Sequence, residues 1–139
     1  MDPMPFRPLL RTQADVEAMW RRLMSPLGFS SHSLWMVVVE HDRPMPQVVE
    51  FSELPTAPRE GDSESLARAI ENLGATSQTS LAFLRTRPGS GRPDPDDLAW
   101  ATTLYAAGHL ADVPLRIIHL AHDHDVIPLP MDDLLAAPA

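Results

Sequence analysis

Hydrophobic positions in the first part of the chain recur at the spacings of one helix and two strands. Apolar side chains three or four residues apart predict an amphipathic helix over residues 13–25, with Thr12 as a suitable N-cap. The continuous apolar run Leu34–Val39 predicts a central strand. Residues His41–Pro46 are expected to turn, so that Gln47–Ser52 forms a second strand, antiparallel to the first because the connection is too short for a crossover.

The middle of the chain shows the pattern of a second helix and a third strand. Ser63 or Ser65 is a suitable N-cap for a helix with leucine and isoleucine on one face, and Gly74 is a suitable stop. The apolar run Ser80–Leu84 predicts the third strand.

The last part of the chain predicts a long helix and a second hairpin. Asp94, followed by a proline at the first helical position, indicates a helix over residues 95–111. Leu115–Ala121 and Val126–Leu129 are predicted strands joined by a tight turn at the sequence HDHD. Met131–Ala139 is expected to be a weakly helical tail.

The order of these elements predicts an α/β fold with a mixed β-sheet flanked by helices, because hairpins and helices alternate along the chain. With 139 residues the chain is expected to form one domain. We place that domain at residues 11–130, between a flexible N-terminal segment, 1–10, and a C-terminal tail, 131–139.

Composition narrows the possible partners and sites. The formal net charge of −8 opposes general binding to nucleic acid or to anionic membranes. The chain has no cysteine, which excludes disulfides, thiolate zinc sites and thiol nucleophiles. No apolar run is long enough for a secretory signal or a membrane span, so we expect a cytoplasmic protein.

Three histidines near the C-terminus form one candidate metal site. His119, His122 and His124 lie in the sequence HLAHDHD, and imidazole with carboxylate is a ligand set that suits zinc. The simpler interpretation is that these are polar residues of a turn, because their spacing matches no established zinc motif.

The stretch LRTRPGSGRPDPDDL holds the other candidate site. Ser90 lies in PGSG, which lacks both the nucleophile elbow of serine hydrolases and the ending of a phosphate loop. Arg85 and Arg87 are two residues apart at the end of a strand, so their side chains point the same way. They form an anion site, together with Arg92, or an ion pair with Asp96 or Asp97, or they are simply exposed to solvent.

The same stretch resembles the JAB/MPN domain of the RadC type. In that family a strand ends in H-x-H-P-S-G and an aspartate on the next helix completes a zinc site; here LAFLRTRPGSGRPDPDDLAWATTL follows a similar course. The segments RTQADVEAMWRRLM, SLWMVVVEHDRPMPQVVEFSELP and AAGHLADVPLRIIHLAHDHDVIPL are similar to other parts of that domain, so the resemblance covers most of residues 11–130. It implies a three-layer sandwich like that of cytidine deaminases.

The departures from the family pattern bear on function. Arg85 and Arg87 stand where the family has its zinc-binding histidines, and Asp97 stands where it has the acidic ligand. A guanidinium has no lone pair for a metal, so no zinc or other cofactor is expected. The family's activating glutamate is replaced near His32, and Glu50 or Glu53 is expected to approach the pocket from the second strand.

The resemblance therefore implies a pseudoenzyme: a metal-free domain without catalytic activity that acts as an interaction or binding module. Its degenerate pocket would comprise Arg85, Arg87, Ser90, Asp97 and Glu50. The alternatives are a peptidase-like hydrolase whose metal site has moved to the three histidines, and a protein that binds a small anionic ligand. The expected partner is a protein or such an anion. Self-association through sheet edges or through the helix with Trp100 is a further expectation. The alternative is that the apolar residues of this helix are buried in the core of one protomer.

Overall fold

The computed structural model describes residues 8–129, apart from the side chain of Pro46. The elements follow the order α1 (Gln13–Leu23), β1 (Ser33–Glu40), β2 (Arg43–Phe51), α2 (Asp62–Asn72), β3 (Ser80–Thr86), α3 (Pro95–Ala111), β4 (Ile118–Ala121) and β5 (Val126–Leu129). The predicted α/β fold with a mixed sheet flanked by helices is confirmed.

Within residues 8–129 the sheet has five strands in the order β2-β1-β3-β4-β5. β1 pairs antiparallel with β2 and with β3, β4 pairs antiparallel with β5, and only the central pair of β3 and β4 is parallel. The helix α3 makes the crossover between these two parallel strands, which a tight turn cannot do.

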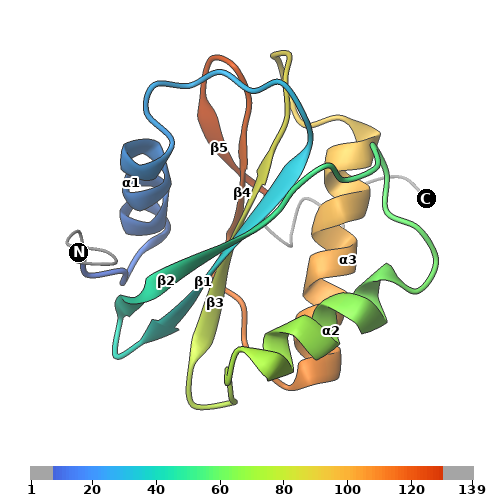
Figure 1. Cartoon of the computed structure of the whole chain (residues 1–139). Coiled ribbons are helices and arrows are strands. Elements are labelled where there is room, and N and C mark those ends of the chain that lie inside the picture. The colour runs from blue at the N-terminus through green and yellow to red at the C-terminus, as the bar shows by residue number, and fades with distance from the viewer. Residues whose placement is uncertain (1–7, 130–139) are drawn as a thin grey trace.

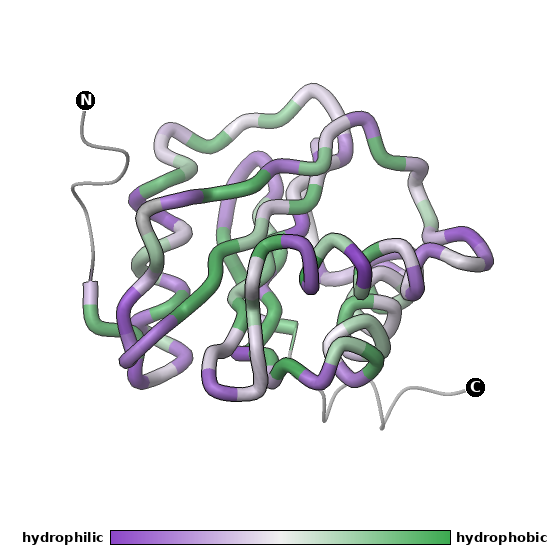
Figure 2. The backbone as a smooth tube through the Cα atoms, turned by 60° about the horizontal axis from the view of Figure 1, so that its bottom comes forward, coloured by the Kyte–Doolittle hydropathy of each residue, from purple (hydrophilic) through white to green (hydrophobic). Residues whose placement is uncertain are grey.

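The sheet is the middle of three layers. Figure 1 shows α1 on one side of the sheet and α2 with α3 on the other. Each face has its own buried cluster: α1 packs through Met19 and Trp20, and α3 packs through Trp100 and Leu104. Both clusters contain residues of the central strands β1 and β3. Figure 2 shows hydrophobic segments in the middle of the fold. Burial of Trp100 and Leu104 agrees with the core interpretation of that helix, and self-association stays a prediction.

The helix boundaries follow from capping residues. Thr12 and Asp15 form a capping box at α1, and Asp94 and Asp97 form one at α3, where the N-cap prediction is confirmed. The prediction of Ser63 or Ser65 as the cap of α2 is wrong: the N-cap is Gly61, in a left-handed conformation with φ of 90° and no side-chain cap.

The predicted turn at His41–Pro46 is wrong. The chain turns over two residues only, His41 and Asp42, both with positive φ, and β2 already starts at Arg43. Pro44 pairs with Val39 inside the strand. Because β2 is an edge strand, a proline there need not break a hydrogen-bond ladder on both sides.

Two further boundaries change. β3 continues beyond Leu84 and includes Arg85 and Thr86, both buried. β4 starts at Ile118 rather than Leu115, which only bridges to Leu81. Leu10, placed by prediction in the flexible N-terminal segment, is fully buried in the core on the α1 face.

The predicted helical tail at 131–139 lies outside the described residues. Among residues 8–129 no helix has the length and hydrophobicity needed to cross a membrane. The cytoplasmic location stays a prediction.

Candidate functional site

The candidate site is formed where β3 ends and α3 begins. Arg85 is the last but one residue of β3, Arg87 follows the strand, and Asp97 lies in the first turn of α3. Residues two apart on a strand point to the same face, so both guanidinium groups reach the helix N-terminus as predicted. All three side chains are almost completely buried, with exposures of 1%, 6% and 0%.

Asp97 is the centre of this arginine–aspartate cluster. Arg85 donates from Nε to Oδ1 at 2.7 Å, while Arg87 donates from Nε to both carboxylate oxygens and from Nη2 to Oδ2 at 2.9 Å. The backbone N–H of Asp94 adds a further bond to Oδ2 at 2.9 Å. The ion pair expected with Asp96 or Asp97 is therefore made with Asp97, through charge-assisted hydrogen bonds of the strong kind.

These contacts fix the charge of Asp97. Burial alone raises the pKa of its carboxyl group, but the hydrogen bonds from Arg87, the Asp94 backbone and Arg85 outweigh burial and leave the pKa below its ordinary value. The carboxylate is thus ionised at neutral pH, and its oxygens are occupied by arginine and backbone donors.

His32, which is half-buried, lies beside Arg85. Its Nδ1 lies 3.3 Å from Arg85 Nη2, and because arginine only donates, Nδ1 must be the acceptor. Burial, followed by the positive charges of Arg85 and Arg87, lowers the pKa of His32, so the ring is neutral at pH 7. The expectation that the family's glutamate is replaced near His32 stays a prediction.

The loop between β2 and α2 covers the cluster. The carbonyl of Thr56 accepts hydrogen bonds from Arg85 Nη2 at 3.3 Å and from Trp100 Nε1 at 3.1 Å. Arg85 Nη1 is buried without a hydrogen-bond partner among the described residues. Sequence reasoning missed Thr56, because a backbone carbonyl carries no side-chain signal.

Glu50 does not belong to this site, contrary to prediction. It pairs in register with Trp35, whereas Arg85 pairs with Leu34, the next residue of β1. Directly opposed residues share a face and adjacent ones alternate, so Glu50 lies on the opposite face of the sheet from Arg85. Glu53 is exposed and has no hydrogen bond to the cluster within residues 8–129.

Ser90 also lies apart from the cluster. It is exposed at the tip of the loop between β3 and α3, and its hydroxyl bonds to none of the described residues. It lines an open groove together with Arg92, His122 and His124. Arg92 contributes only its carbonyl to the cluster, as an acceptor from Arg87 Nη2 at 3.5 Å.

The three histidines of the alternative metal site are not brought together. His119 is buried against α1, where its ring lies 3.0 Å from Gln13 Nε2 and 3.1 Å from the Ile117 carbonyl. The ring of His122 accepts from the His124 backbone N–H instead. Within residues 8–129, no three histidine, aspartate or glutamate side chains are placed to hold one metal ion.

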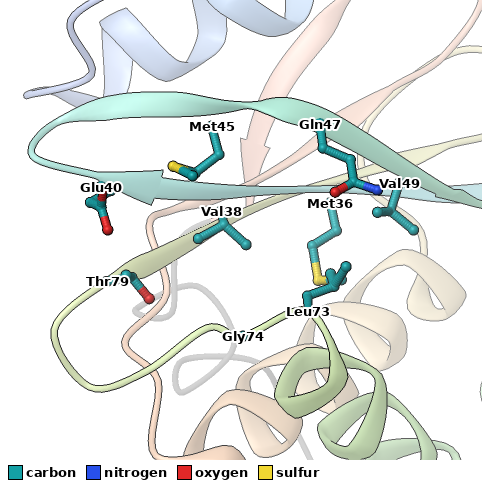
Figure 3. A pocket seen from close by; sticks show the side chains of 9 residues that line it. All are labelled: Met36, Val38, Glu40, Met45, Gln47, Val49, Leu73, Gly74 and Thr79. Carbon is teal, nitrogen blue, oxygen red and sulfur yellow. The ribbon is translucent and has the colours of Figure 1, made fainter. Parts of the chain in front are cut away.

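A separate cavity of about 200 Å³ lies between the sheet and the C-terminal end of α2. Figure 3 shows Met36, Val38 and Met45 lining it, with Glu40 at one end. Its lining contains a single carboxylate and no histidine or arginine, so it offers no set of groups for acid–base or metal chemistry.

The chain matches no model of a known protein family, and a search of curated proteins gives no significant match.

Proposed function

We propose that this protein is a metal-free, JAB/MPN-like domain of the RadC type that serves as a binding module and not as a hydrolase. The observation that carries the proposal is the arginine–aspartate cluster at the end of β3. In the proposed correspondence Arg85 and Arg87 take the places of the family's two histidine ligands and Asp97 takes that of its acidic ligand; hydrogen bonds join both arginines to Asp97.

The chemistry of this cluster supports a pseudoenzyme. Neither arginine has a lone pair for a metal, and the carboxylate of Asp97 already accepts from both of them and from the Asp94 backbone. The net positive charge of the cluster also repels a divalent cation. Without a metal, nothing in the cluster lowers the pKa of a water molecule enough for hydrolysis at neutral pH.

Burial argues that the cluster is structural and that partners bind elsewhere. The carbonyl of Thr56 and the side chain of Trp100 close the cluster from the α2 side. A protein or small anion that binds this domain therefore contacts its surface, including the exposed loop around Ser90. A homodimer through a sheet edge stays a prediction, which sedimentation of the purified chain tests.

Zinc measurements on the wild type and two variants test this proposal. The wild-type chain should contain far less than one equivalent of zinc after purification and after incubation with excess zinc. The double variant Arg85→His with Arg87→His recreates the family's ligand pattern with Asp97, so it should bind one equivalent.

Three outcomes are informative. Stoichiometric zinc in the wild type that is lost on Asp97→Ala would overturn the metal-free proposal. A folded double variant that takes up no zinc would contradict the JAB/MPN assignment, because the backbone would then not present these positions as ligands. Circular dichroism shows whether the variant is folded, and zinc that raises its Tm would support the assignment.

A further inference from the structure

The groove beside Ser90 has the features of a small-ligand site. It has a volume of about 450 Å³ and lies between the loop 88–93 and the turn 122–125. Figure 1 shows these two segments, in yellow and orange, next to each other at one end of the sheet. Ser90 and Arg92 line it from the loop, and His122 and His124 line it from the turn.

The backbone of the loop is held in place from both sides. On the inner side, Arg87 donates from Nη1 to the Pro88 carbonyl at 3.1 Å and from Nη2 to the Arg92 carbonyl. On the outer side, Asp123 accepts from the Gly89 N–H at 2.9 Å and returns a backbone bond to the Gly89 carbonyl at 3.0 Å. The loop that carries Ser90 and Arg92 is therefore fixed before any ligand binds.

The ring of His122 presents a hydrogen-bond donor. The residue is only 5% exposed, and its Nδ1 accepts from the His124 backbone N–H at 3.1 Å. A neutral imidazole that accepts at Nδ1 carries its proton on Nε2. Nε2 bonds to no residue of the described chain, and His122 is one of the residues that line the groove.

One carboxylate, that of Asp125, lines the groove, and Asp123 lies next to it in the turn; both already accept hydrogen bonds from the protein. Asp125 accepts from Arg21 at 2.6 Å and from the Val126 N–H at 2.8 Å. Asp123 accepts from the Phe29 and Gly89 N–H groups, both at 2.9 Å. These contacts place the pKa of each carboxyl below its ordinary value, through backbone bonds for Asp123 and chiefly through Arg21 for Asp125.

Two of the lining side chains, Arg92 and Ser90, offer donors without a partner in the described part of the chain. Neither the Arg92 guanidinium nor the Ser90 hydroxyl makes a side-chain hydrogen bond or ion pair with residues 8–129, and both line the groove with His122. Pro93 and Ile127 give the groove an apolar part. We propose that this groove binds a phosphate monoester: the three donors take the phosphate oxygens, and the apolar part takes the attached organic group.

This site requires no metal and does not depend on the JAB/MPN assignment. The cluster of Arg85, Arg87 and Asp97 supports it only indirectly, because Arg87 holds the loop. Zinc content, which tests the proposed function, is therefore independent of the binding measured here.

Titration followed by NMR tests the proposal. Inorganic phosphate and phenyl phosphate are added to the labelled full chain at constant ionic strength and pH 7.5, while the histidine ring nitrogens and the Ser90 amide are recorded. We expect saturable shifts at the His122 ring and at Ser90, with phenyl phosphate binding more tightly than inorganic phosphate because it also covers Ile127 and Pro93.

Matched variants separate a site from general charge attraction. Arg92→Ala should weaken binding at least about tenfold, since it removes a charge-assisted bond. Arg68→Ala removes the same charge from the exposed face of α2 and should leave affinity within about twofold. Ser90→Ala, at an exposed loop position, should weaken binding without affecting folding.

Either of two results would show that the groove is not a specific anion site. One is the absence of saturable shifts at His122 and Ser90 in the folded wild type. The other is equal weakening by Arg92→Ala and Arg68→Ala, which would show attraction to net charge alone. Tighter binding of acetate than of either phosphate would equally reject the ligand class proposed here.

Discussion

Arg87 and Asp97 form a two-point buried ion pair, with the guanidinium Nε and Nη2 both within 2.9 Å of the carboxylate oxygens. Arg85 adds a second guanidinium to the same carboxylate. Two positive groups thus share one negative group inside the protein. The stability of the site depends on the carboxylate more than on either arginine.

Replacement of Asp97 should be strongly destabilising. In Asp97→Asn two buried guanidinium groups lose their counter-charge, at a cost of about 3–5 kcal/mol in the free energy of unfolding. Urea denaturation measures this difference. Asp96→Asn, a change of the same chemistry one residue earlier on the same helix, should cost less than about 1 kcal/mol; similar losses for both would show that the cluster contributes little.

The two arginines should differ in their contributions. Arg87→Met removes three bonds to Asp97 and the bonds to the Pro88 and Arg92 carbonyls but leaves Asp97 paired with Arg85, so we expect the free energy of unfolding to fall by about 2–3 kcal/mol. Arg85→Met removes the buried Nη1 that has no partner among the described residues and leaves Asp97 paired with Arg87. We therefore expect the free energy of unfolding to fall by only about 1–2 kcal/mol. A larger loss for Arg85→Met would contradict this order.

His119 should make stability depend on pH below neutrality. Burial lowers its pKa to about 4 in the folded protein, from an ordinary value of 6.5. Between these values the unfolded chain binds a proton that the folded chain does not, so the free energy of unfolding falls as pH falls. Lowering the pH from 7 to 5 should therefore lower the free energy of unfolding by about 2 kcal/mol through His119. Raising the pH above 7 should not change this contribution.

Denaturation of wild type and His119→Gln at both pH values isolates this contribution. The variant keeps a polar group near Gln13, but its side chain does not titrate in this range. Between pH 7 and pH 5 its free energy of unfolding should therefore fall by about 2 kcal/mol less than that of the wild type. Parallel pH profiles for the two proteins would show that His119 is not the group responsible.

Gly108 in α3 should not tolerate a methyl group, although alanine is the better helix former. A Cβ there would lie 2.1 Å from Leu115 Cδ1 and 3.0 Å from the Val113 carbonyl oxygen. We expect Gly108→Ala to lower the Tm and to cost about 1–3 kcal/mol. Leu115→Ala in the same chain should recover part of that loss; if it recovers none, the clash with Leu115 is not the cause.

Local signals predicted α3 and the Arg–Asp pairing well. The helix α3 begins at Pro95, as predicted from Asp94 as N-cap and from the proline at the first helical position. Both signals lie within the segment itself and need no contact with the rest of the chain. The shared direction of Arg85 and Arg87 follows from strand geometry alone, and their meeting with Asp97 needs only the neighbouring helix.

Predictions that required register or edge position failed. Glu50 was misplaced because the face it occupies depends on its pairing with Trp35, which no local pattern specifies. The prolines of β2 indicated a turn because the strand's edge position is a property of the whole sheet. The role of Thr56 depends on a backbone carbonyl brought from a distant loop.

The contacts of Arg87 with the carbonyls on either side of the loop have a kinetic consequence. A loop that is already ordered loses little conformational entropy when a ligand arrives. Association at Ser90 and Arg92 should then be a single step whose rate is set by diffusional encounter, without a preceding rearrangement of the protein.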